Sequence, residues 1–228
     1  MQVAVVERLV DLLDPDANQI LNMSVAEATR IVGAGDVAGI RGIDGHFAIV
    51  HKEGQLVRMA RSLGRPMRYF LAKRSEGACL VVAERIDEIQ RFLEAEGLAD
   101  QFHPSYTRMV PAHHLLELRL IGCPDPNPQH RRFFDPPRNR LPADVDAIAQ
   151  RYIEALAGEC ASWLDRIDAR EPIGVLFSGG IDSGSVFLVL YDLLLERGES
   201  PGRLKAFTLS VAGQGSDSAQ ATALLGRL

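Results

Sequence analysis

Six consecutive residues, Ser178-Gly179-Gly180-Ile181-Asp182-Ser183, form the segment of this sequence best suited to binding a phosphate group. Adjacent glycines let the backbone turn tightly and approach a ligand, because no Cβ atom stands in the way. A helix that begins after such a turn presents unpaired N–H groups and the positive end of its dipole to an anion. Ser178 and Ser183 add hydroxyl donors, and Asp182 offers an oxygen ligand for Mg²⁺. The pattern therefore predicts an anion cradle with a place for a magnesium ion.

Two strand-loop-helix units follow one another in the last quarter of the sequence, and the glycine loop belongs to the first. The apolar run over residues 174–177 leads straight into the loop and is typical of a strand buried on both faces. We expect a helix over residues 185–195, a second strand over 204–210 and a further helix from about Ser218. Repeated βα units predict a parallel sheet covered by helices.

The loop differs from the Walker A loop, because GxxxxGK[ST] is absent and no lysine occurs between Arg170 and Gly202. It resembles instead the SGGxDS loop of the ATP pyrophosphatase superfamily, whose members bind the pyrophosphate end of ATP and release it whole. The alternative is an ordinary strand-to-helix turn rich in small residues. Two glycines alone would favour that alternative, whereas six ordered residues between a strand and a helix favour phosphate binding.

The first half of the chain mixes helical and strand patterns. The expected elements are helices over residues 3–13, 25–32 and 86–96, and strands over residues 45–51, 55–61, 67–72, 78–83 and 115–121. Ser24 and Glu27 form a capping box for the second helix, and Gly33-Ala34-Gly35 should stop it. The first four strands should pair as two antiparallel hairpins.

A proline-rich segment over residues 122–142 should interrupt periodic structure. We therefore expect a first domain over residues 1–121, a linker over 122–142 and a second domain over 143–228. The second domain should open with a long helix. Its apolar side consists of Val145, Ile148, Tyr152, Leu156 and Trp163.

The composition indicates a globular, cytoplasmic protein. Of 228 residues 46% are hydrophobic, which suffices for a core, and the net charge of -5 argues against nucleic acid or an anionic membrane as a partner. No apolar run approaches the roughly 20 residues that span a bilayer, and no signal peptide pattern opens the chain. Cys79, Cys123 and Cys160 are too widely spaced for a CxxC metal site and are odd in number, so we expect reduced thiols.

Several stretches resemble motifs of the asparagine synthetase family, in the family's order, over residues 37–228. Residues 43–49, IDGHFAI, are similar to the family's L-x-G-x-F-A-F strand, and residues 60–70, ARSLGRPMRYF, to its R-D-x-x-G-x-x-P-L-Y segment. Residues 82–84, VAE, are similar to the start of A-S-E-x-K-A-L, and residues 110–113, VPAH, to x-P-P-G. Each of these matches is weak alone, but they are colinear with the glycine loop.

The loop region resembles the family most closely. Residues 174–183 stand where the family has G-V-x-L-S-G-G-L-D-S, and residues 207–210, FTLS, match F-T-V-G. The resemblance implies that ATP and Mg²⁺ are cofactors. It assigns the pyrophosphate to Ser178, Gly179, Gly180, Asp182 and Ser183, the Mg²⁺ to Asp182, and adenine contacts to Leu176 and Leu209. Apolar core at the ends of strands is the alternative role of the two leucines.

The resemblance implies a chain of the α/β and α+β classes. Residues up to about 121 would be a degenerate class II glutamine amidotransferase domain, an antiparallel αββα sandwich of the Ntn-hydrolase type. The start of a parallel α/β ATP pyrophosphatase domain, an adenine nucleotide α-hydrolase-like fold, would follow. Residues 172–228 supply two βα units, whereas a doubly wound domain needs about five strands, so we expect a truncated domain or one completed by a companion chain.

The family's glutaminase needs a cysteine directly after the initiator methionine, whose thiol attacks the glutamine amide. This sequence has Gln2 there, and its first cysteine, Cys79, falls within an expected strand. We therefore expect no glutamine hydrolysis. The catalytic residues of the remaining reaction stay unassigned.

The resemblance implies an ATP-dependent amide-forming ligase that acts on a carboxylate-bearing small molecule or peptide and releases AMP and pyrophosphate. One alternative is a non-catalytic nucleotide-binding fragment or one subunit of a split synthetase. A second is an intramolecular amide-forming enzyme of the β-lactam synthetase or lasso-peptide cyclase kind. A second copy of the chain is also left open as a partner.

Three further groups of polar residues have simpler interpretations. The adjacent His113 and His114 suit a loop or surface role better than a metal site, because neighbouring residues of a strand point to opposite faces. Arg61 and Arg65 flank a turn and could contact an anion, but pairs with nearby acids are favoured. The basic segment over residues 130–140 could mimic a nucleic-acid patch. In a proline-rich linker, however, we expect the two phenylalanines to pack and the arginines to face water.

Overall fold

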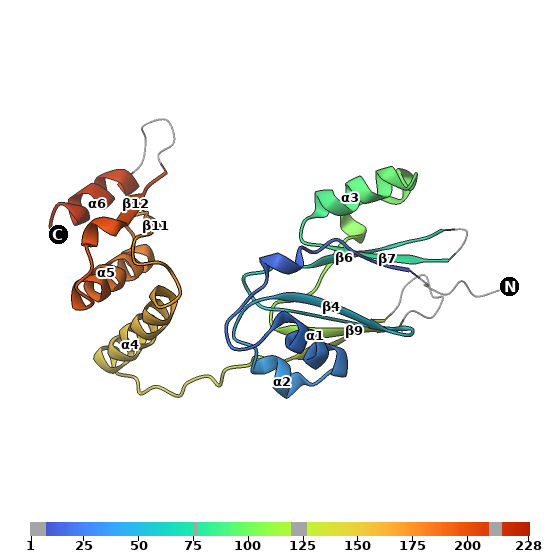
Figure 1. The fold of residues 1–228 in the computed structure, drawn as a ribbon, viewed down its shortest axis with the longest axis horizontal. Coiled ribbons are helices and arrows are strands. Elements are labelled where there is room, and N and C mark those ends of the chain that lie inside the picture. Colours follow the sequence, from blue (N-terminus) through green and yellow to red (C-terminus); the bar gives the residue numbers. More distant parts are fainter. Residues whose placement is uncertain (1–7, 75–76, 120–126, 210–215) are drawn as a thin grey trace. The chain divides into compact units, whose positions relative to one another are not determined.

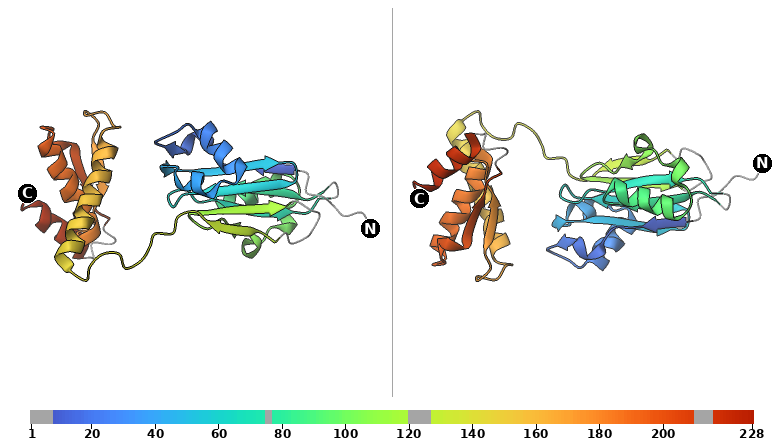
Figure 2. Two further views of the ribbon diagram at one scale, coloured as in Figure 1. Left: turned by 90° about the horizontal axis from the view of Figure 1, so that it is seen from below. Right: turned by 90° about the horizontal axis from the view of Figure 1, so that it is seen from above.

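The computed structural model describes residues 8–74, 77–119, 127–209 and 216–228 (Figures 1 and 2). The chain divides into two compact units, Met1–Pro136 and Pro137–Leu228, and each has a hydrophobic core of its own. Both units combine helices and strands, so the fold class is mixed α and β, as expected.

Two four-stranded sheets form the middle of the first unit, with the orders β1-β7-β6-β8 and β10-β9-β5-β4. The strands of the first sheet are β1 (Arg8–Asp11), β6 (Arg68–Ala72), β7 (Cys79–Ala83) and β8 (Arg108–Met109). Those of the second sheet are β4 (Ala48–Glu53), β5 (Leu56–Arg61), β9 (His114–Arg119) and β10 (Gln129–Arg132). In the described residues these neighbours are antiparallel except β1 and β7, which run parallel.

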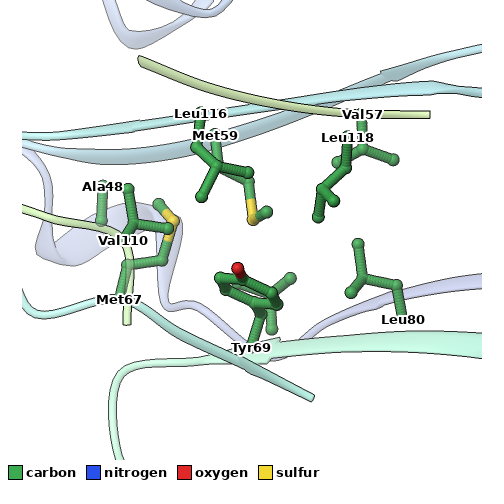
Figure 3. Close-up of a cluster of buried hydrophobic side chains, with 10 residues drawn as sticks. Ala48, Val57, Met59, Met67, Tyr69, Leu80, Val110, Leu116 and Leu118 are labelled. Carbon is green, nitrogen blue, oxygen red and sulfur yellow. The ribbon is translucent and has the colours of Figure 1, made fainter. Parts of the chain in front are cut away.

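The two sheets pack face to face over an apolar core (Figure 3). Met59 and Leu116 of the second sheet point toward Tyr69 and Leu80 of the first, and all four side chains are buried. Alternation along each strand supplies this layer, because successive side chains of a strand point to opposite faces. The strands therefore still have a second apolar face to cover.

Helices cover these outer faces, as Figure 1 shows. Helices α1 (Val25–Ala34) and α2 (Val37–Arg41) pack on the second sheet, and α3 (Ile86–Ala95) packs on the first. The first unit is thus layered helix, sheet, sheet, helix. Every residue of β7 is buried, since its strand lies between α3 and the other sheet. A small pair of strands, β2 (Gln19–Ile20) and β3 (Gly45–His46), adds to this unit.

Most local predictions for the first unit are confirmed. The Ser24 hydroxyl accepts the backbone N–H of Glu27 at 3.2 Å, and Gly35 ends α1 in the left-handed conformation, with φ of 69°. Both expected hairpins are present, as the pairs β4–β5 and β6–β7. The short 3-10 helices of this unit are Pro15–Ala17, Ala99–Gln101 and Pro104–Tyr106.

Two predictions for this unit are wrong. The expected helix over residues 3–13 is contradicted by β1, which pairs with β7 in the register Val10↔Val81; residues 3–7 lie outside the described part. Part of the expected linker forms β10, which pairs with β9, and Phe133 directly after it is buried against Phe47. In both cases another strand supplies hydrogen-bond partners that local periodicity does not reveal.

The second unit contains two parallel strands, β11 (Ile173–Leu176) and β12 (Leu204–Phe207), as expected. Its helices are α4 (Val145–Leu164), α5 (Ile181–Glu196) and α6 (Ser216–Leu225), with a 3-10 turn at Pro201–Arg203. The core of this unit joins one face of the sheet to the helices. Its members include Val175, Phe187, Leu190, Leu204 and Ala221.

Two burial predictions for the second unit are wrong. Strand β11 is buried on one face only, since Ile173 and Val175 are buried while Gly174 and Leu176 are exposed. The expected apolar side of α4 is buried only toward its end, at Leu164. The exposed apolar residues of this helix are Val145, Ile148, Tyr152, Ile153 and Trp163.

Candidate functional site

The glycine loop leaves the carboxyl end of β11 and enters the first turn of α5 directly, as its sequence predicts. Because β11 and β12 are parallel, the chain after β12 reaches the same edge of the sheet. The N–H of Phe177 donates to the carbonyl of Phe207 at 2.8 Å, and the hydroxyl of Thr208 donates to the carbonyl of Phe177 at 2.6 Å. These bonds hold the loop beside residues 207–209.

The two serine hydroxyls of the loop meet each other. The Oγ atoms of Ser178 and Ser183 lie 3.2 Å apart, although five residues separate them in the chain. Ser183 Oγ also accepts the N–H of Ser178 at 3.2 Å, and Ser178 Oγ accepts the N–H of Gly180 at 3.3 Å. These hydrogen bonds therefore stabilise the loop as a compact turn. They also bring the hydroxyls of Ser178 and Ser183 next to each other.

In the described residues, the first turn of α5 has backbone N–H groups that are not hydrogen-bonded. Gly180 is the N-cap residue and has no side chain to cap the helix, and the N–H of Gly184 is the first that bonds back, to the carbonyl of Gly180 at 2.9 Å. The N–H groups of residues 181–183 therefore point out of the helix end. Such a group of donors, together with the helix dipole, is a site for an anion.

The two glycines are needed for different reasons. Gly179 has φ of 77°, and a Cβ atom on it would lie 2.9 Å from the backbone nitrogen of Ala221 in α6. Gly180 has an ordinary φ of -77°, and a Cβ atom on it would meet only Ser178 Oγ, at 3.3 Å. The fold itself thus requires glycine at position 179. At position 180 glycine leaves open space above the helix end, as close approach by a ligand demands.

Asp182 is exposed in the first turn of α5 and takes part in no ion pair of the described residues. No group of three or more metal-ligating side chains occurs in the described part of the chain. A Mg²⁺ ion here would have Asp182 as its carboxylate ligand and would take its other oxygens from phosphate and water. The donor set of the loop fits a metal-bound phosphate chain better than a bare cation.

The expected adenine contacts lie on the open face and edge of the sheet. Leu176 and Leu209 are each 86% exposed. The sequence analysis missed Phe207, which stands opposite Leu176 in the strand register and is 58% exposed. Its ring reaches over Gly174, where a Cβ atom would lie 3.3 Å from the ring. Leu176, Phe207 and Leu209 together form an exposed apolar surface, which we call the ledge. The two-residue spacing of Phe207 and Leu209 is typical of residues on one face of a strand and could have indicated this surface.

The cysteines of the described residues are structural. Cys79 is only 1% exposed, and burial raises the pKa of its thiol, although Arg8 and Arg74 act in the opposite direction. Burial likewise raises the pKa of the half-buried Cys160. A buried thiol with a raised pKa is a poor nucleophile. Cys123 lies outside the described residues.

The other polar candidates have structural partners or face solvent in the described part of the chain. Arg65 pairs with Glu84 at 2.5 Å, as expected, but Arg61 donates to carbonyl oxygens, among them that of Val110 at 2.6 Å, and to no acid of the described residues. In the basic segment the arginines of β10 are exposed, as expected. Phe133 is buried, whereas Phe134 is 41% exposed, so the packing prediction holds for one of the two rings.

Part of the chain matches a family of known proteins. Residues 161–228 match the family model described as asparagine synthase, and this segment contains the end of α4, both strands, the glycine loop, α5 and α6. The match supports the resemblance to that family at the level of the second unit. No curated protein matches the chain. In the described part of the chain, none of the helices combines the length and apolar character needed to cross a bilayer.

Proposed function

We propose that this chain supplies the nucleotide-binding part of an ATP-dependent amide-forming ligase of the asparagine synthase kind. The observation that carries the proposal is the glycine loop. It joins the carboxyl end of a parallel strand to an uncapped helix N-terminus, within the segment that matches asparagine synthase. An uncapped helix end with two nearby hydroxyls is suited to hold the β- and γ-phosphates of ATP.

In the proposed reaction a substrate carboxylate attacks the α-phosphorus of ATP, and the bond to the bridging oxygen breaks so that pyrophosphate leaves. Ammonia or an amine then displaces AMP and forms the amide. The N–H groups of residues 181–183 and the hydroxyls of Ser178 and Ser183 would stabilise the charge that develops on the departing pyrophosphate. Mg²⁺ held by Asp182 would neutralise part of that charge.

The nucleobase would lie on the ledge formed by Leu176, Phe207 and Leu209. All three side chains are exposed, and Phe207 and Thr208 are hydrogen-bonded to Phe177, where the chain enters the loop. A flat base can stack on the Phe207 ring while the leucines cover its edge. Binding of the nucleobase would explain why these three apolar side chains are exposed.

The first unit fits the interpretation of a class II amidotransferase domain that has lost its activity. Its four layers agree with the αββα arrangement, although β1 pairs in parallel. The deeply buried Cys79 cannot replace a terminal nucleophile. The nitrogen would therefore come as free ammonia or as an amine, and an amine within the substrate itself would give a cyclic product, as in β-lactam synthetases and lasso-peptide cyclases.

A second candidate is a nucleotide-binding subunit that acts only with a companion chain. The exposure of Leu176, Phe207 and Leu209 favours it, because a companion that adds strands or a helix to this face would bury them. In this case the loop keeps its role, while the carboxylate site belongs to the assembled protein.

Exchange of labelled pyrophosphate into ATP tests the proposal. The chain should be assayed with a panel of carboxylates, alone and with candidate companion chains, and the Asp182→Ala variant serves as the control. We expect exchange that Asp182→Ala abolishes. Exchange only in the presence of a companion would support the second candidate, and exchange that survives the substitution would refute the assignment of the loop.

A further inference from the structure

A cavity of about 290 Å³ lies in the first unit, where the ends of α2 and β10 and the strand β3 meet. All of its lining residues belong to the first unit, whereas the glycine loop belongs to the second. Its lining includes Arg41, Asp44, Phe47, His113, Phe133 and Phe134. Its volume is close to the lower end of the range of ligand pockets, roughly 300–1,000 Å³.

His113 adopts an unusual backbone conformation at this cavity. Its φ of 59° lies in the left-handed region, which glycine adopts freely and other residues adopt at a cost. Its N–H donates to the carbonyl of Arg61 at 3.0 Å, and its carbonyl accepts the N–H of Phe133 at 2.9 Å, so β5 and the end of β10 hold it in place. The asparagine synthetase motif x-P-P-G has glycine at the corresponding position. This chain therefore keeps a strained histidine where the motif has an unstrained residue.

The imidazole of His113 is packed but not hydrogen-bonded. Its ring meets Phe133 edge-on at 5.8 Å between centroids and Phe134 at 5.0 Å. No hydrogen bond of the described residues uses either ring nitrogen. Burial lowers the pKa of His113, and the positive charges of Arg132 and Arg61 and the neighbouring His114 lower it further. At neutral pH the ring is therefore uncharged, and its one N–H group is available to a ligand. The nearby arginines make the electrostatic potential around the ring positive.

We propose that this cavity binds a small monocarboxylate that has a flat apolar body. The rings of Phe47, Phe133 and Phe134 provide walls for the apolar body. The imidazole N–H of His113 and the guanidinium of Arg41 provide donors for the carboxylate. Asp44 also lines the cavity and opposes a second negative charge on the ligand.

Phenylacetate is a suitable probe, because it joins one carboxylate to one flat ring. We expect isothermal titration of the full chain to give a dissociation constant on the order of 1 mM, as befits about ten non-hydrogen atoms. The neutral phenylacetamide, which has the same shape, should bind about tenfold more weakly. Equal affinity for the two probes, or no binding of phenylacetate, would overturn the proposal.

The His113→Gly variant separates ligand binding from folding. Glycine accepts φ of 59°, so this variant should melt at the same temperature as the native chain or higher, yet bind phenylacetate at least about tenfold more weakly. His113→Asn, which also tolerates this conformation, should behave in the same way. His114→Gln is the matched control, because the Nδ1 of His114 bonds to the carbonyl of Ala112, and it should keep the native affinity. Native affinity in the folded His113→Gly and His113→Asn variants would contradict a role for this imidazole.

Discussion

Replacing each loop glycine by alanine should separate the fold of the second unit from its ligand binding. Gly179→Ala places a Cβ atom 2.9 Å from the backbone nitrogen of Ala221, and it does so at a φ of 77°. Gly180→Ala places one at an ordinary φ of -77°, with Ser178 Oγ as its nearest neighbour at 3.3 Å. Gly179→Ala therefore requires α6 to move away from the loop, whereas Gly180→Ala requires only a small shift of the Ser178 hydroxyl.

The expected magnitudes follow from these contacts. A left-handed conformation disfavours an L-residue by roughly 1–2 kcal/mol, and overpacking against α6 adds roughly 1–3 kcal/mol. Gly179→Ala should thus lower the free energy of unfolding of the second unit by about 2–5 kcal/mol. Gly180→Ala should change it by less than about 0.5 kcal/mol, as is usual for exposed sites. Its new methyl group nevertheless stands over the helix end and should weaken MgATP binding.

Urea denaturation followed by tryptophan fluorescence measures this difference directly. Trp163 is the single tryptophan of the chain and lies at the end of α4, next to the buried Leu164, so its signal reports on the second unit. The first unit contributes no tryptophan to the signal. If Gly180→Ala destabilises this unit as much as Gly179→Ala does, the distinction between a structural and a ligand-facing glycine is wrong.

Three further predictions concern stability. Glu117→Gln should destabilise the first unit by about 1 kcal/mol, because Glu117 pairs with Arg58 at 2.7 Å and with Arg131 at 2.9 Å. The loss of stability should be smaller at high salt, and circular dichroism during denaturation measures it. Burial raises the pKa of Cys79 above the unfolded value of about 8.5, so the unfolded chain loses this proton first. The first unit should therefore lose stability as the pH rises through and above about 8.5, and Cys79→Ala should lack that part of the decline in parallel melts. Asp144→Ala should lower the stability of the second unit by about 1 kcal/mol in the fluorescence assay, because the Asp144 carboxylate caps α4; no change would show that the first turn of α4 contributes nothing.

The features that the sequence predicts well depend on neighbours close in the chain. The cap at Ser24, the left-handed stop at Gly35 and the loop at residues 178–183 each need only a few adjacent residues, and all are present. Both hairpins follow from short turns between apolar strands. The geometry of the glycine loop, our proposed phosphate site, can therefore be predicted from the sequence, because the loop is one continuous segment.

The features that the sequence hides depend on partners far away in the chain. Residues 8–11 have helical spacing, yet they form a strand because β7, about seventy residues later, offers a parallel edge. Leu176 appears in an apolar run, but whether it is buried depends on what covers the second face of the sheet. The left-handed His113 is likewise fixed by hydrogen bonds to Arg61 of β5 and to Phe133, which follows β10, and no local pattern records these bonds.

Calorimetric titration of MgATP into the folded chain measures directly whether the loop holds a nucleotide. We expect the native chain to bind MgATP, and we expect Ser178→Ala and Asp182→Ala each to weaken this binding by about tenfold or more. Ser185→Ala is the matched control, since its hydroxyl donates to the carbonyl of Ile181 within α5, and it should bind as the native chain does. Equal affinity in all four folded proteins, or no binding by the native chain, would contradict the claim that this loop holds the phosphates of a nucleotide.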